Sequence, residues 1–409
     1  MQGERAAPES PPAIGREGRP TVALVVFCQI VQGTVFSALP LLLPLIREDL
    51  QLTFTQAGLL SAAATFTYAL GQIPSGYLAD RHGPRWLFFT GLLMWSALSL
   101  AFGAVHAFWL AVLVQLVAGA FRALLFAPGL TLLASWFAPE RRATAMSLYM
   151  LGGFAGTIVF SLAGPALAAR YGWRATFMLF AALGIAAALV YAALSAENPR
   201  ARAAHPPALG DLGRLLRRPI LWVCAGLQFL RFTVVTAFHL WLPSLLVEDR
   251  GFSVQAAGLV VAASAALTAV SNTLGGYLSD RLRNPPLVIG GALAMLAATS
   301  LLIAFTEQAP LLLVVIAVNA VFLQFYFGPL FMVPVEVLGP RVAGTVTGFA
   351  NLFANLGGIL SAWLLGAARD ATGAFAWGFA GVGLACIAGV LLAAALARMR
   401  RRALAAQAA

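Results

Sequence analysis

The feature that most constrains this chain is a succession of apolar runs, each about as long as a lipid bilayer is thick. A helix needs about 20 apolar residues to cross the hydrocarbon core. Only 10% of the residues are charged, whereas a soluble domain carries about 25%. We therefore predict an all-α integral membrane protein with twelve transmembrane helices. The predicted spans are 21–46, 55–78, 86–105, 107–137, 143–168, 175–196, 219–246, 254–278, 286–306, 309–337, 343–368 and 376–397.

The chain also repeats itself at long range. GYLADR at 76–81 returns as GYLSDR at 276–281, and weaker echoes occur at a similar offset. Duplicated helical units that share a site near the bilayer midplane are a common transporter architecture. We therefore predict two pseudo-symmetric six-helix bundles. The expected parts are a disordered cytoplasmic tail at 1–20, an N-terminal bundle at 21–196, a cytoplasmic linker at 197–218, a C-terminal bundle at 219–397 and a cytoplasmic tail at 398–409.

All 26 basic residues are arginines, and their distribution predicts the topology. Basic residues collect in cytoplasmic loops. Placing both termini in the cytoplasm leaves nineteen arginines on the cytoplasmic side, five in outer loops and two inside spans. We therefore expect a multi-pass protein of the cell inner membrane with both termini in the cytoplasm.

The stretch after the second predicted span reads SGYLADRHGPR and fits a G-x-L-x-D-R-x-G motif. A degenerate copy of the motif follows the eighth span. On these motifs, and along essentially its whole length, the chain resembles transporters of the major facilitator superfamily. Among them it is most similar to organic-anion members, that is, anion:cation symporters and monocarboxylate-type carriers.

The resemblance implies a conformational role for the motif residues. An aspartate at the cytoplasmic end of span two or eight would face the positive N-terminus of span eleven or five in the opposite half, and so form a latch that closes the cytoplasmic side. The alternatives are an ordinary positive-inside loop and, for the glutamates, solvated interfacial pairing. The residues assigned to this latch are Gly76, Asp80, Arg81, Gly83, Arg85, Asp280, Arg281, Glu140 and Glu336.

Two arginines lie deep inside predicted spans. Arg122 is fifteen residues from either end of 107–137, and Arg231 is twelve residues into 219–246. A charge at the bilayer centre costs at least about 2.5–3.5 kcal/mol and usually faces a cavity or a partner. Because no Asp or Glu lies in the interior of any span, we expect the counter-ion to be the cargo. One arginine from each half would then clamp a carboxylate or phosphate. The alternative is that each arginine caps backbone carbonyls or binds structural water.

The resemblance supports the two arginines unevenly. The stretch 229–258 is similar to the seventh span of organic-anion and organophosphate transporters, which carry an anion-binding arginine where Arg231 stands. The fourth span departs from the family: in the anion:cation symporter group, an arginine stands at the position of Gln115 and a glutamate at that of Arg122. The resemblance therefore supports Arg231 but not Arg122.

Other polar residues within the spans are candidates to line a substrate cavity. His239 is a candidate for proton coupling, because histidine titrates near neutrality; the alternative is a packing residue. For the remaining candidates the alternative is interhelical hydrogen bonding. They are Gln29, Gln115, Asn319, Gln324, Tyr326, Asn351 and Asn355.

These observations predict a secondary active transporter that moves a small organic anion, above all a carboxylate, by alternating access. Proton-coupled symport and anion exchange both stay open. The alternative is proton-driven efflux of a drug or metabolite, favoured by Gly164-Pro165, which partly matches an antiporter motif. The chain has no GxxxxGKS/T loop for ATP and no metal-ligand or Ser/His/Asp cluster, so we expect no enzyme activity and no cofactor. We also expect a monomer in the lipid bilayer without a nucleic-acid partner.

Overall fold

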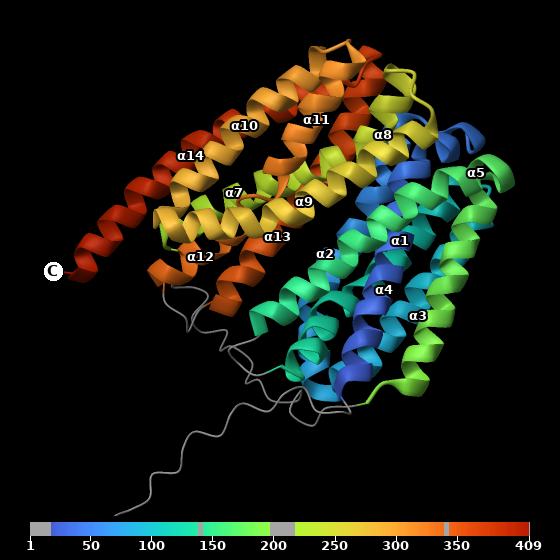
Figure 1. The fold of residues 1–409 in the computed structure, drawn as a ribbon, viewed down its shortest axis with the longest axis horizontal. Helices are drawn as coiled ribbons and strands as arrows, with labels where there is room; N and C mark the ends of the chain where they lie inside the picture. Colours follow the sequence, from blue (N-terminus) through green and yellow to red (C-terminus); the bar gives the residue numbers. More distant parts are fainter. Residues whose placement is uncertain (1–17, 138–141, 197–216, 339–342, 409) are drawn as a thin grey trace, which may run out of the picture.

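The structure is a computed structural model that describes residues 18–137, 142–196, 217–338 and 343–408 (Figure 1). Within these ranges the chain is helical and forms no strand. The helices of the N-terminal half are α1 (Gly18–Asp49), α2 (Phe54–His82), α3 (Pro84–Gly103), α4 (Phe108–Ser135) and α5 (Arg142–Leu194). The C-terminal half begins with α7 (Pro219–Thr236), the π-helical turn η4 (Ala237–Trp241), α8 (Leu242–Ser244) and a second π-helical turn, η5 (Leu245–Asp249). It continues with α9 (Val254–Leu282), α10 (Pro285–Phe305), α11 (Ala309–Leu323), α12 (Phe327–Leu338), α13 (Ala343–Thr372) and α14 (Ala376–Ala408).

Among the described residues, ten helices are long and apolar enough to cross a membrane. Two features account for the difference from the twelve predicted spans. α5 contains two of them, because its backbone leaves the helical region at Gly172, where the positive φ of 80° favours glycine. The second feature is α2, which is not among the ten: it is a 29-residue helix with several Thr, Ser and Gln residues along its length. The predicted all-α fold of twelve helices is confirmed.

Local sequence signals set several helix starts. Thr53 caps α2 through a reciprocal capping box with Gln56. Ser253 caps α9 by accepting a hydrogen bond from the amide of Ala256 at 3.1 Å. The two capping residues are 200 apart in sequence, the offset of the GYLxDR repeat. The duplication therefore extends to the caps.

The two halves pack their helices in the same way. In the N-terminal half, α1 packs on α5, while α2 and α3 pack on α4. In the C-terminal half, α7 packs on α13, while α9 and α10 pack on α11. The pair α3 and α5 likewise matches the pair α10 and α14. The repeat in sequence is therefore a repeat in structure, which confirms the predicted pair of pseudo-symmetric bundles.

The most extensive contacts between the halves are made by two helix pairs, α2 with α13 and α5 with α9. A glycine permits each close approach. A Cβ atom on Gly58 would overlap the carbonyl oxygen of Ala362, and one on Gly258 would overlap that of Ser161. Gly58 and Gly258 are again 200 residues apart. The duplication thus supplies the contact between the halves as well as the halves themselves.

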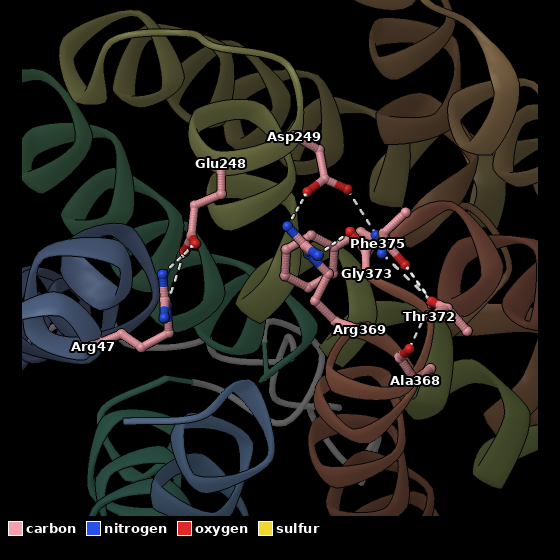
Figure 2. Close-up of polar contacts among 9 residues, drawn as sticks. Arg47, Glu248, Asp249, Ala368, Arg369, Thr372, Gly373 and Phe375 are labelled. Atoms are coloured by element: carbon pink, nitrogen blue, oxygen red, sulfur yellow. Dashed lines mark hydrogen bonds and ion pairs between the residues drawn. The ribbon is translucent and has the colours of Figure 1, made fainter. Parts of the chain in front are cut away.

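Polar contacts between the halves gather at one end of the molecule, which we call the closed end. It is formed by the end of α1, the start of α2 and the ends of η5 and α13. Arg47 of α1 pairs with Glu248 of η5 at 2.6 Å, as Figure 2 shows. Asp370 of α13 accepts hydrogen bonds from the backbone amides of Phe54 and Thr55 at 3.0 and 2.7 Å. An aspartate of one half therefore lies at the positive N-terminus of a helix in the other half.

Neighbouring contacts hold the closed end together. Arg369 pairs with Asp249 at 3.0 Å, and Asp249 also accepts a hydrogen bond from the amide of Phe375 at 2.7 Å (Figure 2). The ring of Phe54 contacts the guanidinium groups of Arg47 and Arg369, at 4.2 and 4.8 Å. Away from this end the two halves diverge, as the directions of α3 and α14 show in Figure 1.

Candidate functional site

A cavity of about 380 Å³ lies between the two halves. Helices α1 to α5 line it from one half, and α7, η4, α8, α9, α11 and α13 line it from the other. Three of the candidate residues, Arg231, Tyr326 and Asn351, are not among its lining residues. The candidates that do line it are Gln29, Gln115, Arg122, His239, Asn319, Gln324 and Asn355.

Arg122 of α4 reaches the cavity between two aromatic rings. Its guanidinium lies 4.1 Å from the ring of Phe36 and 4.6 Å from that of Tyr68. Its Nε atom is buried and has no hydrogen-bond partner among the described residues. Cation–π contacts contribute about 0.5–2 kcal/mol but leave the guanidinium's hydrogen-bonding capacity unused. Since neither Asp nor Glu occurs in the lining of the cavity, Arg122 meets no counter-ion there.

His239 stands on the π-helical turn η4. Such turns inside α-helices are rare and are frequent at functional sites. The His239 ring stacks on the ring of Phe36, with centroids 4.8 Å apart and an interplanar angle of 10°. Phe36 thus contacts Arg122 in its own half and His239 in the other half. Phe36 carries no signal in the sequence, because it is one apolar residue among many in its span.

Arg231 of α7 lies behind the cavity wall, and its side chain is 3% exposed. Its Nε atom donates to Oε1 of Gln228 at 2.8 Å, and its Nη1 atom donates to Oε1 of Gln324 at 3.1 Å. The guanidinium also lies over the rings of Phe232 and Phe327, at 5.4 and 4.9 Å. Amides and aromatic rings surround this buried cation, and one of the two amides, Gln324, belongs to the cavity lining.

The tenth predicted span, 309–337, is interrupted. Helix α11 ends at Leu323 and α12 begins at Phe327, so residues 324–326 lie between two helices. The break follows from Pro329, which lacks an N–H group and whose ring clashes with the carbonyl of the residue four positions earlier, Phe325. That carbonyl lies so close to α9 that a Cβ atom on Gly275 would overlap it. Pro329 and Gly275 were therefore the sequence signals for a break that periodicity alone did not predict.

Two of the remaining amides, Asn319 and Asn355, donate hydrogen bonds within their own half. Asn319 donates from Nδ2 to Oγ1 of Thr299 at 2.8 Å. Asn355 donates from Nδ2 to the carbonyl of Asn351 at 2.8 Å, while its buried Oδ1 has no partner among the described residues. The buried Oε1 of Gln29 has none there either. The cavity lining thus combines one cation with several amides that retain unused hydrogen-bonding capacity.

The latch residues are placed only in part, and the latch stays a prediction. Glu140 lies outside the described residues, and nothing is described of the side-chain surroundings at Gly76 and Asp80. The described side chains of Arg81, Asp280 and Arg281 are exposed.

Three further latch candidates have defined surroundings. Gly83 separates α2 from α3 with a φ of 85°. Arg85 donates from Nε to Oγ of Ser195 at 2.9 Å, a contact within its own half. Glu336 of α12 pairs with Arg400 of α14 at 2.7 Å, also within one half.

Comparisons with known proteins agree on the type of molecule. The family model described as Major Facilitator Superfamily matches residues 25–362. The chain is 26% identical over 358 residues to a probable sulfoacetate transporter of Cupriavidus necator, covering 81% of this chain and 83% of that protein. It is 25% identical to a hexuronate transporter of Bacillus subtilis, covering 88% and 90%.

A solved structure has the same fold. A bacterial homologue of the human lysosomal transporter Spinster, in an inward-facing and unoccupied conformation, aligns with a TM-score of 0.76. The alignment covers 94% of this chain and 96% of the homologue at 21% identity. The named relatives are transporters, and the fold is that of a transporter, so the chain is a membrane transporter rather than an enzyme. Because the family model spans most of its length, the chain belongs to the Major Facilitator Superfamily.

Proposed function

We propose that this transporter moves a small organic anion carrying a carboxylate group, by alternating access of the central cavity to the two sides of the membrane. The observation that carries the proposal is Arg122, a cavity-lining cation with a free buried Nε atom and no Asp or Glu in the lining. A carboxylate would supply both the missing charge and the missing hydrogen-bond acceptors.

The named cargoes of the relatives support an anion. Sulfoacetate and hexuronate, the cargoes named for the two relatives described above, are both organic acids that carry a carboxylate. These cargoes differ in shape but share a negative charge. A cavity lined by one cation and several amides suits that shared chemistry.

The arginine count supports an orientation for the conformation seen. Four of the five arginines assigned to the outer side, Arg47, Arg174, Arg250 and Arg369, pair or hydrogen-bond at the closed end or beside it. The closed end would then face outward and the diverging ends would face the cytoplasm. In this proposal the structure is the inward-facing state of the cycle.

Efflux of a cationic drug is the weaker alternative. The titratable side chains that line the cavity are Arg122, His239 and Tyr68, and none of them carries a negative charge near neutral pH. A lipophilic cation would meet Arg122 without a compensating carboxylate in that lining. Proton symport and anion exchange both remain compatible with this lining, and His239 is the proposed coupling group for symport.

Uptake into proteoliposomes tests the proposal. The purified protein would be offered labelled mono- and dicarboxylates, a sulfonate and a lipophilic cation, each with and without a pH gradient. We expect uptake of at least one carboxylate, and we expect Arg122→Gln to lower its kcat/KM at least about tenfold, because a charge-assisted hydrogen bond contributes about 1.5–3 kcal/mol.

The matched control is Arg170→Gln, which removes the same charge from an exposed position outside the cavity. We expect this variant to transport as the unsubstituted protein does. Movement of the lipophilic cation alone would refute the proposal and favour efflux, and undiminished carboxylate uptake by Arg122→Gln would remove Arg122 from the site.

A further inference from the structure

The two mid-membrane arginines have different surroundings, although the sequence presents them as a pair. Arg122 lines the cavity and keeps a buried Nε atom without a partner among the described residues. Arg231 does not line the cavity, is 3% exposed and has two amide oxygens as hydrogen-bond acceptors. Because Arg231 does not line the cavity, a shared role as two arms of one anion clamp would require its guanidinium to move.

The contact between Arg231 and Gln324 fixes the orientation of an amide. A guanidinium has donors only, so the amide atom that faces it must be the oxygen. Nη1 of Arg231 lies 3.1 Å from Oε1 of Gln324. The Nε2 group of the same amide has no hydrogen bond to a described residue, while the Gln324 side chain belongs to the cavity lining. The free donor of Gln324 is therefore available to a molecule in the cavity.

The backbone around Gln324 supports a binding role. Residues 324–326 form the break between α11 and α12. Non-helical backbone at membrane depth occurs only where it is buried in protein or lines a cavity. Interrupted helices supply substrate sites in other transporter folds. Pro329 causes the break and Gly275 accommodates the displaced carbonyl of Phe325, so Gln324 is held at the cavity wall by the fold.

We infer that Gln324 is a specificity-determining residue whose Nε2 group donates to an oxygen of the cargo, and that Arg231 is a positioning residue that orients this amide without touching the cargo. The inference rests on the proposed function. The anion would then receive a charged donor from Arg122 in one half and a neutral, oriented donor from Gln324 in the other.

A kinetic double-mutant cycle tests this arrangement. Arg231→Gln, Gln324→Leu and the double variant would be compared for the best carboxylate in the uptake assay, after thermal unfolding has confirmed that each is folded. We expect each single change to raise KM about tenfold with little change in the maximal rate. We expect the double variant to match Gln324→Leu alone, because Arg231 acts through Gln324.

A second variant distinguishes the loss of the Gln324 donor from misfolding. Gln324→Glu keeps oxygens for Arg231 to bind but removes the donor that faces the cavity. We expect it to fold as stably as the unsubstituted protein and to lose carboxylate uptake more than Gln324→Leu does, because the new carboxylate repels the anion. Arg170→Gln combined with Gln324→Leu is the control, expected to match Gln324→Leu.

The outcomes separate the inference from the proposed function. If KM rises about a hundredfold in the double variant, the two effects multiply, Arg231 contacts the anion on its own and the inference is overturned. Normal uptake by Gln324→Glu would also overturn it. If the unsubstituted protein takes up none of the organic anions, the proposed function fails and the inference falls with it, a result that is read before any variant is made.

Discussion

At the scale of single residues, the molecule places two similar arginines in unlike settings. Both stand near the middle of a predicted span, and a charge at the centre of a bilayer is costly without a partner. Aromatic rings flank Arg122, and its Nε atom has no hydrogen-bond partner among the described residues. Amide oxygens satisfy part of the capacity of Arg231. Depth in a span therefore does not specify the neighbours of an arginine, and the proposed roles of the two differ because their neighbours differ.

Phe36 contacts both Arg122 in its own half and His239 in the opposite half. Its ring contacts the Arg122 guanidinium at 4.1 Å and stacks on His239 at 4.8 Å. We expect Phe36→Leu to raise the KM for a carboxylate by roughly two- to thirtyfold, because a cation–π contact contributes about 0.5–2 kcal/mol. Initial uptake rates against concentration provide the measurement.

Phe36→Tyr is the matched variant, because it keeps the ring. We expect its KM to stay close to that of the unsubstituted protein. Equal KM values for the Leu and Tyr variants would show that the ring contributes only volume, and the contact with Arg122 would then have no part in anion binding.

At the scale of helices, two irregular elements contribute side chains to the cavity beside the regular helices that line it. The seventh span carries the π-helical turn η4 with His239, and the tenth span is broken at residues 324–326 beside Gln324. Regular helices complete their own hydrogen bonds and present side chains at fixed angles. A π-helical turn or a break redirects a side chain that a regular helix would place elsewhere.

The break in span ten gives a prediction about one proline. In Pro329→Ala the new N–H group can bond to the carbonyl of Phe325, so α11 and α12 can join into one helix. We expect the variant to keep or raise its thermal unfolding temperature while its KM for a carboxylate rises several-fold, because Gln324 is displaced. Thermal unfolding and uptake kinetics of the same preparation check both effects.

Pro285→Ala is the control for that change. Pro285 stands in the first turn of α10, where no hydrogen bond is lost through the missing N–H group. We expect unchanged transport in this control. An unaltered KM for Pro329→Ala would show that the break in span ten has no part in substrate binding.

At the scale of the whole molecule, the conformation depends on contacts that join the halves at the closed end. The ion pair of Arg47 and Glu248 and the bonds from Phe54 and Thr55 to Asp370 all cross between the halves. A transporter that rocks must break them to open this end. The predicted latch of Asp80 and Asp280 would act at the opposite ends of α2 and α9, so each end would have its own electrostatic closure.

The role of the Arg47–Glu248 ion pair at the closed end can be tested by removing one of its charges. We expect Glu248→Gln to shift the population toward the state open at this end by about fivefold, since a partly exposed ion pair contributes up to about 1 kcal/mol. Spin labels at Gln51 and Gln255, which are exposed residues of opposite halves, report the separation. The three native cysteines are buried and should not compete for the label.

Two further variants make the closed-end measurement specific. The exchange Arg47→Glu with Glu248→Arg should restore the original distance distribution, because it restores the pair. Glu48→Gln, an exposed carboxylate next to Arg47 in sequence, should leave that distribution unchanged. If Glu248→Gln gives the same distances as the unsubstituted protein, the pair does not bias the equilibrium.

The sequence by itself determined the class of fold, the duplication and the depth of the two arginines. Run length must match bilayer thickness, and the repeated GYLxDR motif fixes the offset between the halves. The same offset recurs in Thr53 and Ser253 and in Gly58 and Gly258. These properties are readable because each depends on residues close together in the chain or on a fixed offset between two copies.

Only the tertiary structure decided which polar residues share the cavity, where span ten breaks and which end of the molecule is closed. Arg122 meets Phe36, and Arg231 meets Gln324, because separate helices pack side by side. The rotation of each helix about its axis sets these partners. In a lipid bilayer, apolar faces toward lipid and toward protein carry nearly the same residues, so an apolar sequence does not specify that rotation.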